Sequence, residues 1–141
     1  MKKLMFAVVL MVAISGRAQA LEFWHSGTVW AGQGQCSANF TFDAGALSDQ
    51  ISDLKVSVDL LEKGKVVGTS IMKVANIGGS EADRYATGLI ESEDVCSDSL
   101  VIRVTKATAV INGKHVNLVK TKDITARNFK PFNITIAGGK K

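Results

Sequence analysis

The sequence is poor in the residues that catalytic and metal sites use. Its 141 residues include two histidines and two cysteines, whereas a zinc site takes three or four protein ligands. We therefore expect His25 and His115 at the surface or at a rim and not as ligands. The sequence contains no Gly-x-Ser-x-Gly elbow, no phosphate-binding glycine loop and no dinucleotide fingerprint. The sequence thus predicts no catalytic residue, no cofactor and no metal, and a protein that is not an enzyme.

After its first twenty residues the chain also lacks an apolar run long enough to span a membrane. The first twenty residues combine the basic pair Lys2-Lys3, the apolar stretch Leu4–Ile14 and the small residues Ala18-Gln19-Ala20. This order is that of a secretory signal peptide. We expect cleavage after Ala20, which leaves residues 21–141 as a single domain. A short leader that opens with MKK is typical of bacteria, so the product is expected to be periplasmic or secreted.

Only two cysteines, Cys36 and Cys96, are present. In an exported protein such a pair favours one intramolecular disulfide, while free thiols or an intermolecular bond are the alternatives. Closing a loop of about 60 residues would add roughly 4 kcal/mol of stability in the chain-entropy description. The bridge is therefore expected to matter for a domain of this size.

Basic residues are scarce in the first part of the mature chain, and acidic residues are scarce in its last part. Residues 21–102 carry a net charge of −7, and residues 103–141 carry +8. The two parts could form opposite patches that attract a second copy, or folding could interleave them so that they cancel. We expect a homodimer on this ground and because open sheets have exposed edges. Export and a mature charge near zero argue against nucleic acid as a partner.

Segments of alternating apolar and polar residues dominate what is present, and no amphipathic helix of ten residues occurs. The pattern predicts an all-β sandwich of the fibronectin type III-like or immunoglobulin-like kind with one disulfide. Residues 43–53 are expected to be turn-rich, with at most one helical turn. The expected strands are residues 22–31 (interrupted at 26–27), 35–42, 54–61, 66–77, 84–90, 100–111, 114–120 and 132–137.

Asn112-Gly113 lies between two β-rich arms, which is the strongest short-range signal for a hairpin. A two-residue turn pairs Ile111 with Lys114, Ala109 with Val116, and Ala107 with Leu118. Upstream, the apolar residues change from odd to even positions, which suggests a bulge or bend near Thr105-Lys106. A strand that changes faces in this way often passes from one sheet of a sandwich to the other.

Two aromatic residues are the candidates for partner binding. Trp24 and Trp30 lie near the expected mature N-terminus, and tryptophan is enriched at binding hot spots. The alternative is that one or both close the end of the sandwich, and this alternative is favoured for Trp30. The loop with Glu91, Glu93, Asp94 and Asp98 lacks the spacing of a calcium loop, so a solvated turn is the favoured interpretation.

The whole chain resembles the interleukin receptor mimic protein family of bacteria, the IrmA type. The resemblance rests on the leader, the Cys36/Cys96 pair, the lysine-ended tail, and the segments LEFWHSGTVW and QCSANFTFDAGALSD. It implies a small secreted protein of bacterial virulence with a fibronectin type III-like fold. It further implies a dimer that exchanges strands, and a receptor-like surface that binds host interleukins. No functional residue follows from the resemblance, because it contains no binding motif.

The leading hypothesis is therefore a secreted, non-enzymatic binding protein that resembles a cytokine-receptor mimic and binds an extracellular protein. The alternative is a periplasmic assembly factor or a hydrolase inhibitor. An enzyme with a minimal site is the least favoured possibility, because the chain supplies so few catalytic residue types.

Overall fold

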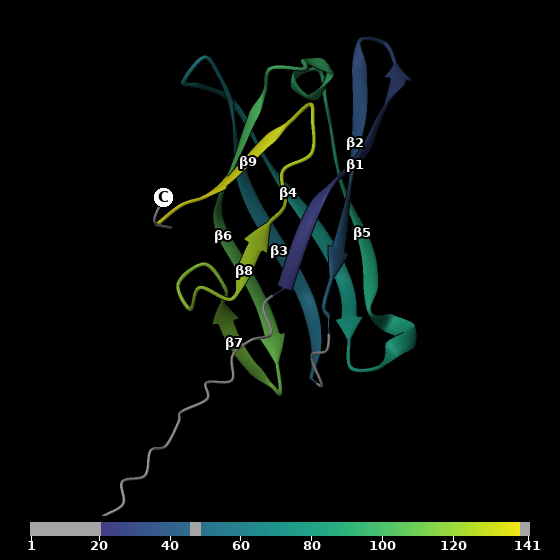
Figure 1. The fold of residues 1–141 in the computed structure, drawn as a ribbon, viewed down its shortest axis with the longest axis vertical. Coiled ribbons are helices and arrows are strands. Elements are labelled where there is room, and N and C mark those ends of the chain that lie inside the picture. The colour runs from purple at the N-terminus through teal and green to yellow at the C-terminus, as the bar shows by residue number, and fades with distance from the viewer. Residues whose placement is uncertain (1–20, 46–48, 139–141) are drawn as a thin grey trace, which may run out of the picture.

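The computed structural model describes residues 21–45 and 49–138, and the predicted signal peptide lies outside the described residues (Figure 1). The described part contains nine strands and two single-turn 3-10 helices. Within it, no helix is long and apolar enough to cross a membrane. The all-β prediction is confirmed.

The strands form two sheets that pack face to face. Sheet A has the order β5-β2-β1-β8, and sheet B has the order β4-β3-β6-β7, with β9 paired to β6. This order fits the predicted fibronectin type III-like sandwich. The elements are β1 (Leu21–Gly32), β2 (Gln35–Asp43), β3 (Gln50–Glu62), β4 (Lys65–Gly78), η1 (Glu81–Asp83), β5 (Tyr85–Ser92), η2 (Asp94–Cys96), β6 (Val101–Ile111), β7 (Lys114–Asn117), β8 (Ile124–Ala126) and β9 (Asn133–Ile136).

The core lies between the two sheets and is built from the alternating positions of their strands. Phe23, Phe40 and Phe42 project from sheet A and are fully buried. The rings of Phe23 and Phe42 are stacked with their centroids 5.0 Å apart. Val56 and Leu60 are among the buried residues that face them from sheet B. The alternation of apolar residues in β2 and in residues 54–60 of β3 places one side of each strand in the core, as the sequence predicts.

The predicted hairpin is present as β6 and β7. Ile111 pairs with Lys114 and Ala109 with Val116, as expected for a two-residue turn. Asn112 and Gly113 have φ values of 54° and 77°, the left-handed conformation that such a turn requires. The third predicted pair, Ala107 with Leu118, is joined by a 2.7 Å hydrogen bond in which the Leu118 N–H donates to the Ala107 carbonyl oxygen. Leu118 lies one residue beyond the end of β7 at Asn117.

The predicted irregularity near Thr105 is a β-bulge. Ser57 pairs with Lys106 and Val58 pairs with Val104, so Thr105 is left without a counterpart on β3. The extra residue restores the inward direction of apolar side chains on both sides of the bulge. The strand does not change sheets, however: β6 stays in sheet B along its whole length. The suggested passage between sheets is wrong, because a single bulge turns the side chains without moving the backbone out of the ladder.

Several boundaries differ from the sequence-based expectation. β1 runs without interruption, and Ser26-Gly27 forms a bulge against β2. β3 begins at Gln50, inside the segment expected to be turn-rich, because Asp53 adopts a positive φ of 50° at a register shift that keeps the strand paired. The sequence did not predict strand β8, because its three residues are too few to show an alternating pattern.

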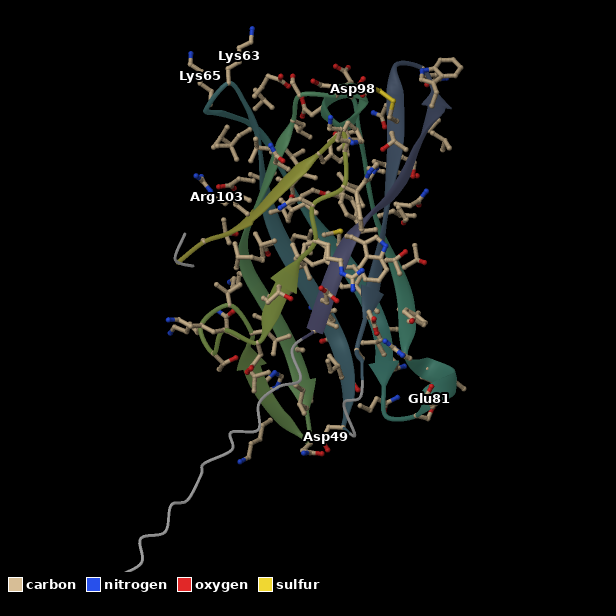
Figure 2. All side chains as sticks on the ribbon, viewed as in Figure 1. Asp49, Lys63, Lys65, Glu81, Asp98 and Arg103 are labelled. Atoms are coloured by element: carbon tan, nitrogen blue, oxygen red, sulfur yellow. A yellow bond between two sulfur atoms is a disulfide. The ribbon has the colours of Figure 1, made fainter. Side chains whose placement is uncertain are left out.

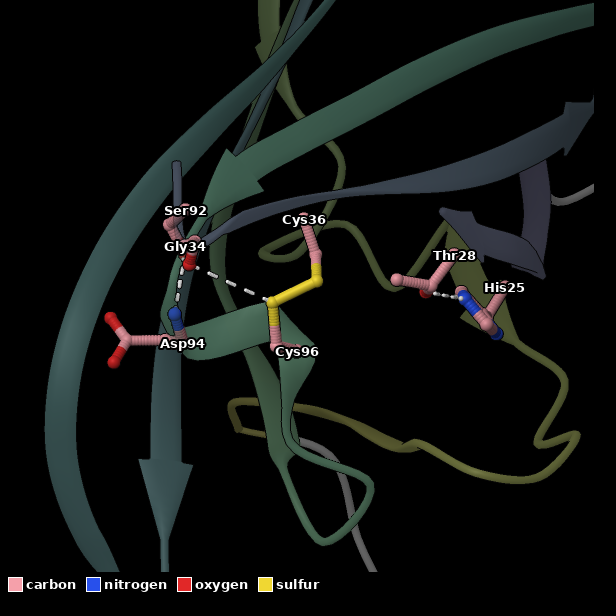
Figure 3. Close-up of a disulfide and its surroundings, with 7 residues drawn as sticks. All are labelled: His25, Thr28, Gly34, Cys36, Ser92, Asp94 and Cys96. Carbon is pink, nitrogen blue, oxygen red and sulfur yellow. Dashed lines mark hydrogen bonds between the residues drawn. A yellow bond between two sulfur atoms is a disulfide. The ribbon is translucent and has the colours of Figure 1, made fainter. Parts of the chain in front are cut away.

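Cys36 and Cys96 form the disulfide, with Cα atoms 5.3 Å apart. No free cysteine remains, so the free-thiol alternative is wrong. The bridge joins β2 to η2 in the loop between β5 and β6, near the β1–β2 turn (Figure 3). It thereby fixes one end of sheet A to the connection that leads into sheet B.

The C-terminal segment contacts both sheets in succession. β8 pairs in parallel with β1 at Leu21–Phe23, and β9 pairs in parallel with β6 at Val101–Val104. Figure 1 shows this segment crossing from β8 to β9 at the yellow end of the chain. Between β8 and β9 lies an open cavity of about 260 Å³ with an apolar lining that includes Ile124, Ala126 and Ile136.

Candidate binding surface

The end of β1, next to the β1–β2 turn, carries the most exposed large apolar side chains of the described residues. Trp30 is 71% exposed and Val29 is 58% exposed. Trp30 pairs in register with Cys36, the residue bridged to η2. The prediction that Trp30 closes the end of the sandwich is wrong, because β1 and β2 extend beyond the core and leave the indole in solvent. The disulfide beside it limits the motion of this turn.

Trp24 lies on the outer face of sheet A and is only partly exposed. The guanidinium group of Arg127 is 5.1 Å from the centre of its ring. The Nε of Arg127 also donates a 2.9 Å hydrogen bond to the Glu22 carboxylate. The chain just after β8 therefore covers one side of Trp24 with a cation that is held in place by an acid two residues before the tryptophan.

A second cluster of the same composition lies at the other edge of the sheet. Arg84 donates from Nε and Nη2 to the two carboxylate oxygens of Asp43, at 2.7 and 3.1 Å. Its guanidinium carbon is 5.0 Å from the centre of the Tyr85 ring. The side-chain hydrogen bond from Arg84 lowers the pKa of Asp43, with further help from the Gly45 N–H and despite the opposing effect of burial.

The two clusters are neighbours on one surface. Glu22 pairs in register with Asp43, and Asp43 pairs in register with Tyr85, so the acids of the two clusters lie on adjacent strands. The positive charge of Arg127 also contributes to the lowered pKa of Asp43. The strands β1, β2, β5 and β8 thus present a continuous outer face with an aromatic ring and an ordered arginine at each side.

Sequence reasoning selected Trp24 and Trp30 but missed Arg84, Arg127 and Tyr85. Arg127 is 105 residues away from Glu22, and nothing local to either residue indicates the other. A weak signal was available for Tyr85, because it directly precedes the inward-facing Ala86 and therefore has to point outward. The structure does not bring the two tryptophans onto one face: Trp24 aligns with the outward Thr41, and Trp30 aligns with Cys36.

The two histidines differ in their environments. His25 is 7% exposed, so the prediction of a surface or rim position is wrong for it. A 2.7 Å hydrogen bond joins its Nε2 to the Thr28 hydroxyl, as drawn in Figure 3. Burial lowers the pKa of His25, and a hydrogen bond with the backbone of Gly27 opposes this effect. His115 is exposed in β7, as predicted.

The acidic loop forms part of the same end of the molecule as Trp30. Asp94 opens η2 and its N–H donates a 3.1 Å hydrogen bond to the Ser92 hydroxyl (Figure 3). Figure 2 labels Asp98 at this end, near the β3–β4 turn with Lys63 and Lys65. Among the described residues, no group of three or more His, Cys, Asp or Glu side chains is placed to hold a metal ion.

These features define a disulfide-bridged β-sandwich with an exposed tryptophan turn and an arginine- and aromatic-bearing face. The family model of IrmA, described as interleukin receptor mimic protein A, matches residues 21–126. The chain belongs to this family. It is similar to a solved structure of IrmA from Escherichia coli, with a TM-score of 0.67 and 24% identity, over 83% of this chain and 98% of that one. No curated protein matches the chain significantly.

Proposed function

We propose that the protein is an exported receptor mimic that binds host interleukins and has no enzymatic role. Membership of the interleukin receptor mimic family carries this proposal. The exposed Trp30 supports it, because burying a largely solvent-exposed apolar ring under a partner is favourable. The disulfide next to Trp30 supports it further, since an ordered turn loses little conformational entropy on binding.

Surface plasmon resonance with the immobilised mature protein tests the function. A panel of host interleukins should include at least one that gives saturable, dose-dependent binding. The variant Trp30→Ala should weaken this binding at least tenfold, while Val66→Ala, an exposed apolar residue of β4, should leave it unchanged. A flat response to the whole panel, with protein that is folded by circular dichroism, would refute the proposal.

We further propose that the protein is a homodimer that exchanges its C-terminal strands. Two very short strands, β8 and β9, hold the C-terminal segment, and both lie at sheet edges beside an apolar cavity. Such a segment can leave its own sandwich and regain the same contacts, including the burial of Phe132, in a second copy. Sedimentation equilibrium at micromolar concentration should give twice the monomer mass, and a monomer mass would contradict this proposal.

Export is the third part of the proposal. It rests on the basic, apolar and small-residue order of positions 1–20 and on the disulfide, which persists in oxidising compartments. Expression of the full chain in a bacterium should yield a mature protein whose N-terminal sequence starts at Leu21. Its presence in culture supernatant supports a secreted product; confinement to the periplasm would favour an assembly factor or inhibitor instead.

A further inference from the structure

The outer face of sheet A differs in composition from the outer face of sheet B. Along their described lengths, the four strands of sheet A contain no lysine, and all lysines of the described strands lie in sheet B, at positions 55, 65, 73, 106 and 114. Lysine is depleted in protein–protein interfaces, whereas tyrosine, tryptophan and arginine are enriched there. In its lack of lysine and its Trp24, Tyr85 and arginine side chains the outer face of sheet A resembles an interface, and it also carries the acids Glu22 and Asp43.

The two arginines on this face are already ordered. Arg127 lies over the Trp24 ring and is bonded to Glu22, and Arg84 lies by the Tyr85 ring and is bonded to Asp43. An arginine that is fixed before binding loses less side-chain entropy when a partner arrives. The bond to Glu22 uses one of the five N–H donors of Arg127, and the bonds to Asp43 use two of those of Arg84. The remaining donors suit carboxylate or carbonyl acceptors on another protein.

Apolar side chains complete the surface. Leu89 is 45% exposed and Tyr85 is 56% exposed on β5, and Val29 is 58% exposed where the face meets the Trp30 turn. From the Glu22 row to the Val29 row, β1, β2 and β5 form a face of roughly 300 Å² at ordinary strand spacing. β8 adds only a short strip beside Leu21–Phe23. A stable interface buries about 800 Å² per partner. The face alone is therefore smaller than a stable interface, so the partner also has to contact the loops around it.

We infer that the outer face of sheet A is the surface on which the interleukin-type partner docks. This inference rests on the proposed function and names its contact surface. The partner offers hydrogen-bond acceptors opposite Arg127 and Arg84, whose remaining N–H groups are donors and whose charges are matched by Glu22 and Asp43. It offers aliphatic groups opposite Leu89 and Tyr85. Trp24 acts through Arg127, whose guanidinium carbon lies 5.1 Å from the centre of its ring. Val29 marks the end of this surface, whereas Trp30 aligns with Cys36 and lies on the opposite side of β1.

The test compares matched variants of the two sheets in surface plasmon resonance with the interleukin that wild-type protein binds. Arg127→Ala and Leu89→Ala each weaken binding at least tenfold. Their controls are Arg103→Ala and Ile71→Ala in sheet B, which leave the affinity within twofold. Arg103 is a close match, because it forms a 2.9 Å ion pair with Asp59 and, among the described residues, lies over no aromatic ring. Ile71 is 52% exposed.

A second variant of Arg127 distinguishes the effect of its planar shape on binding from the effect of its positive charge. Arg127→Lys keeps the positive charge but loses the planar group that stacks on Trp24, and it weakens binding at least fivefold. Melting temperatures within a few degrees of wild type show that the variants are folded. If wild-type protein binds and the sheet A variants bind equally well, the inference is overturned and the proposed function stands. If wild-type protein binds no interleukin, both are overturned. Dissociation of a wild-type dimer by Arg127→Ala would assign the face to a second copy and also overturn the inference.

Discussion

The ring of His25 lies 4.5 Å, centroid to centroid, from the ring of Phe132. His25 belongs to β1 and Phe132 directly precedes β9, so this contact joins the first strand of the sandwich to its last segment. The His25 ring also meets Phe40 of β2 edge-on at 5.4 Å. A titratable ring is therefore enclosed by two phenylalanines where the C-terminal segment crosses between the sheets.

The burial of His25 predicts a pH-dependent stability. Because its pKa is lowered in the folded state, the unfolded chain binds a proton first as the pH falls below about 6.5. The stability that neutral His25 contributes is therefore complete above pH 6.5 and declines as the pH falls towards the lowered pKa. The urea midpoint should decrease between pH 7.5 and 5.5 in wild-type protein, and it should decrease less in His25→Phe.

His115→Gln serves as the control, since His115 is exposed and its removal should leave the wild-type pH dependence intact. The pKa of Asp43 is also lowered, but Asp43 affects stability in a different pH range. The stability that its carboxylate contributes is lost only as the pH falls below about 4. An equal midpoint decrease in His25→Phe and wild type would show that His25 is not the responsible group.

Phe132 is predicted to hold the C-terminal segment to the core. It is 2% exposed, so Phe132→Ala leaves a cavity and should lower the free energy of unfolding by about 3 kcal/mol. Phe129 in the same segment is 46% exposed, and Phe129→Ala should change the free energy by less than about 0.5 kcal/mol. Urea denaturation of the two variants under identical conditions measures this difference; equal effects would contradict the packing described.

Removal of the disulfide is predicted to be costly. The double variant Cys36→Ser/Cys96→Ser opens a loop with a sequence separation of 60, which should lower the free energy of unfolding by about 2–4 kcal/mol. Wild-type protein treated with a reductant provides the internal control and should lose a similar amount. Unchanged urea midpoints in both samples would mean that the bridge does not constrain the unfolded chain.

The β6–β7 turn is predicted to depend on the conformation of Gly113. A side chain at φ +77° is strained even though nothing lies within 4 Å of the added Cβ, so Gly113→Ala should destabilise the protein by about 1 kcal/mol. Asn112→Gly should cost much less, because glycine adopts the same positive φ without strain. Thermal denaturation of the pair checks this, and a larger loss for Asn112→Gly would contradict it.

The features that the sequence predicted correctly are those with a local cause. Alternation in β2 and β3 has a period of two that only a half-buried strand satisfies, and Asn112-Gly113 has the conformational freedom that a tight hairpin needs. The shift of apolar parity around Thr105 likewise located a bulge before any partner strand was known. The two cysteines pair as predicted because no other thiol competes for them.

The candidate site was predicted only in part. Trp24 and Trp30 were selected by residue type, but their exposures were not, since β1 carries Trp30 beyond the core and Arg127 covers Trp24. Two ion pairs join the acidic part of the chain, residues 21–102, to the basic part, residues 103–141. They are Glu22 with Arg127 and Asp59 with Arg103. Such contacts depend on strand order, which no local pattern encodes.

By itself, the sequence determined most of the strands, the hairpin, its bulge and the supply of one disulfide, because each follows from neighbouring residues and from the pleat of a strand. The tertiary structure alone decided that His25 is buried, that β8 exists, and that two arginines lie over aromatic rings on one face. Those outcomes depend on which distant strands become neighbours, and packing of the whole core sets that order.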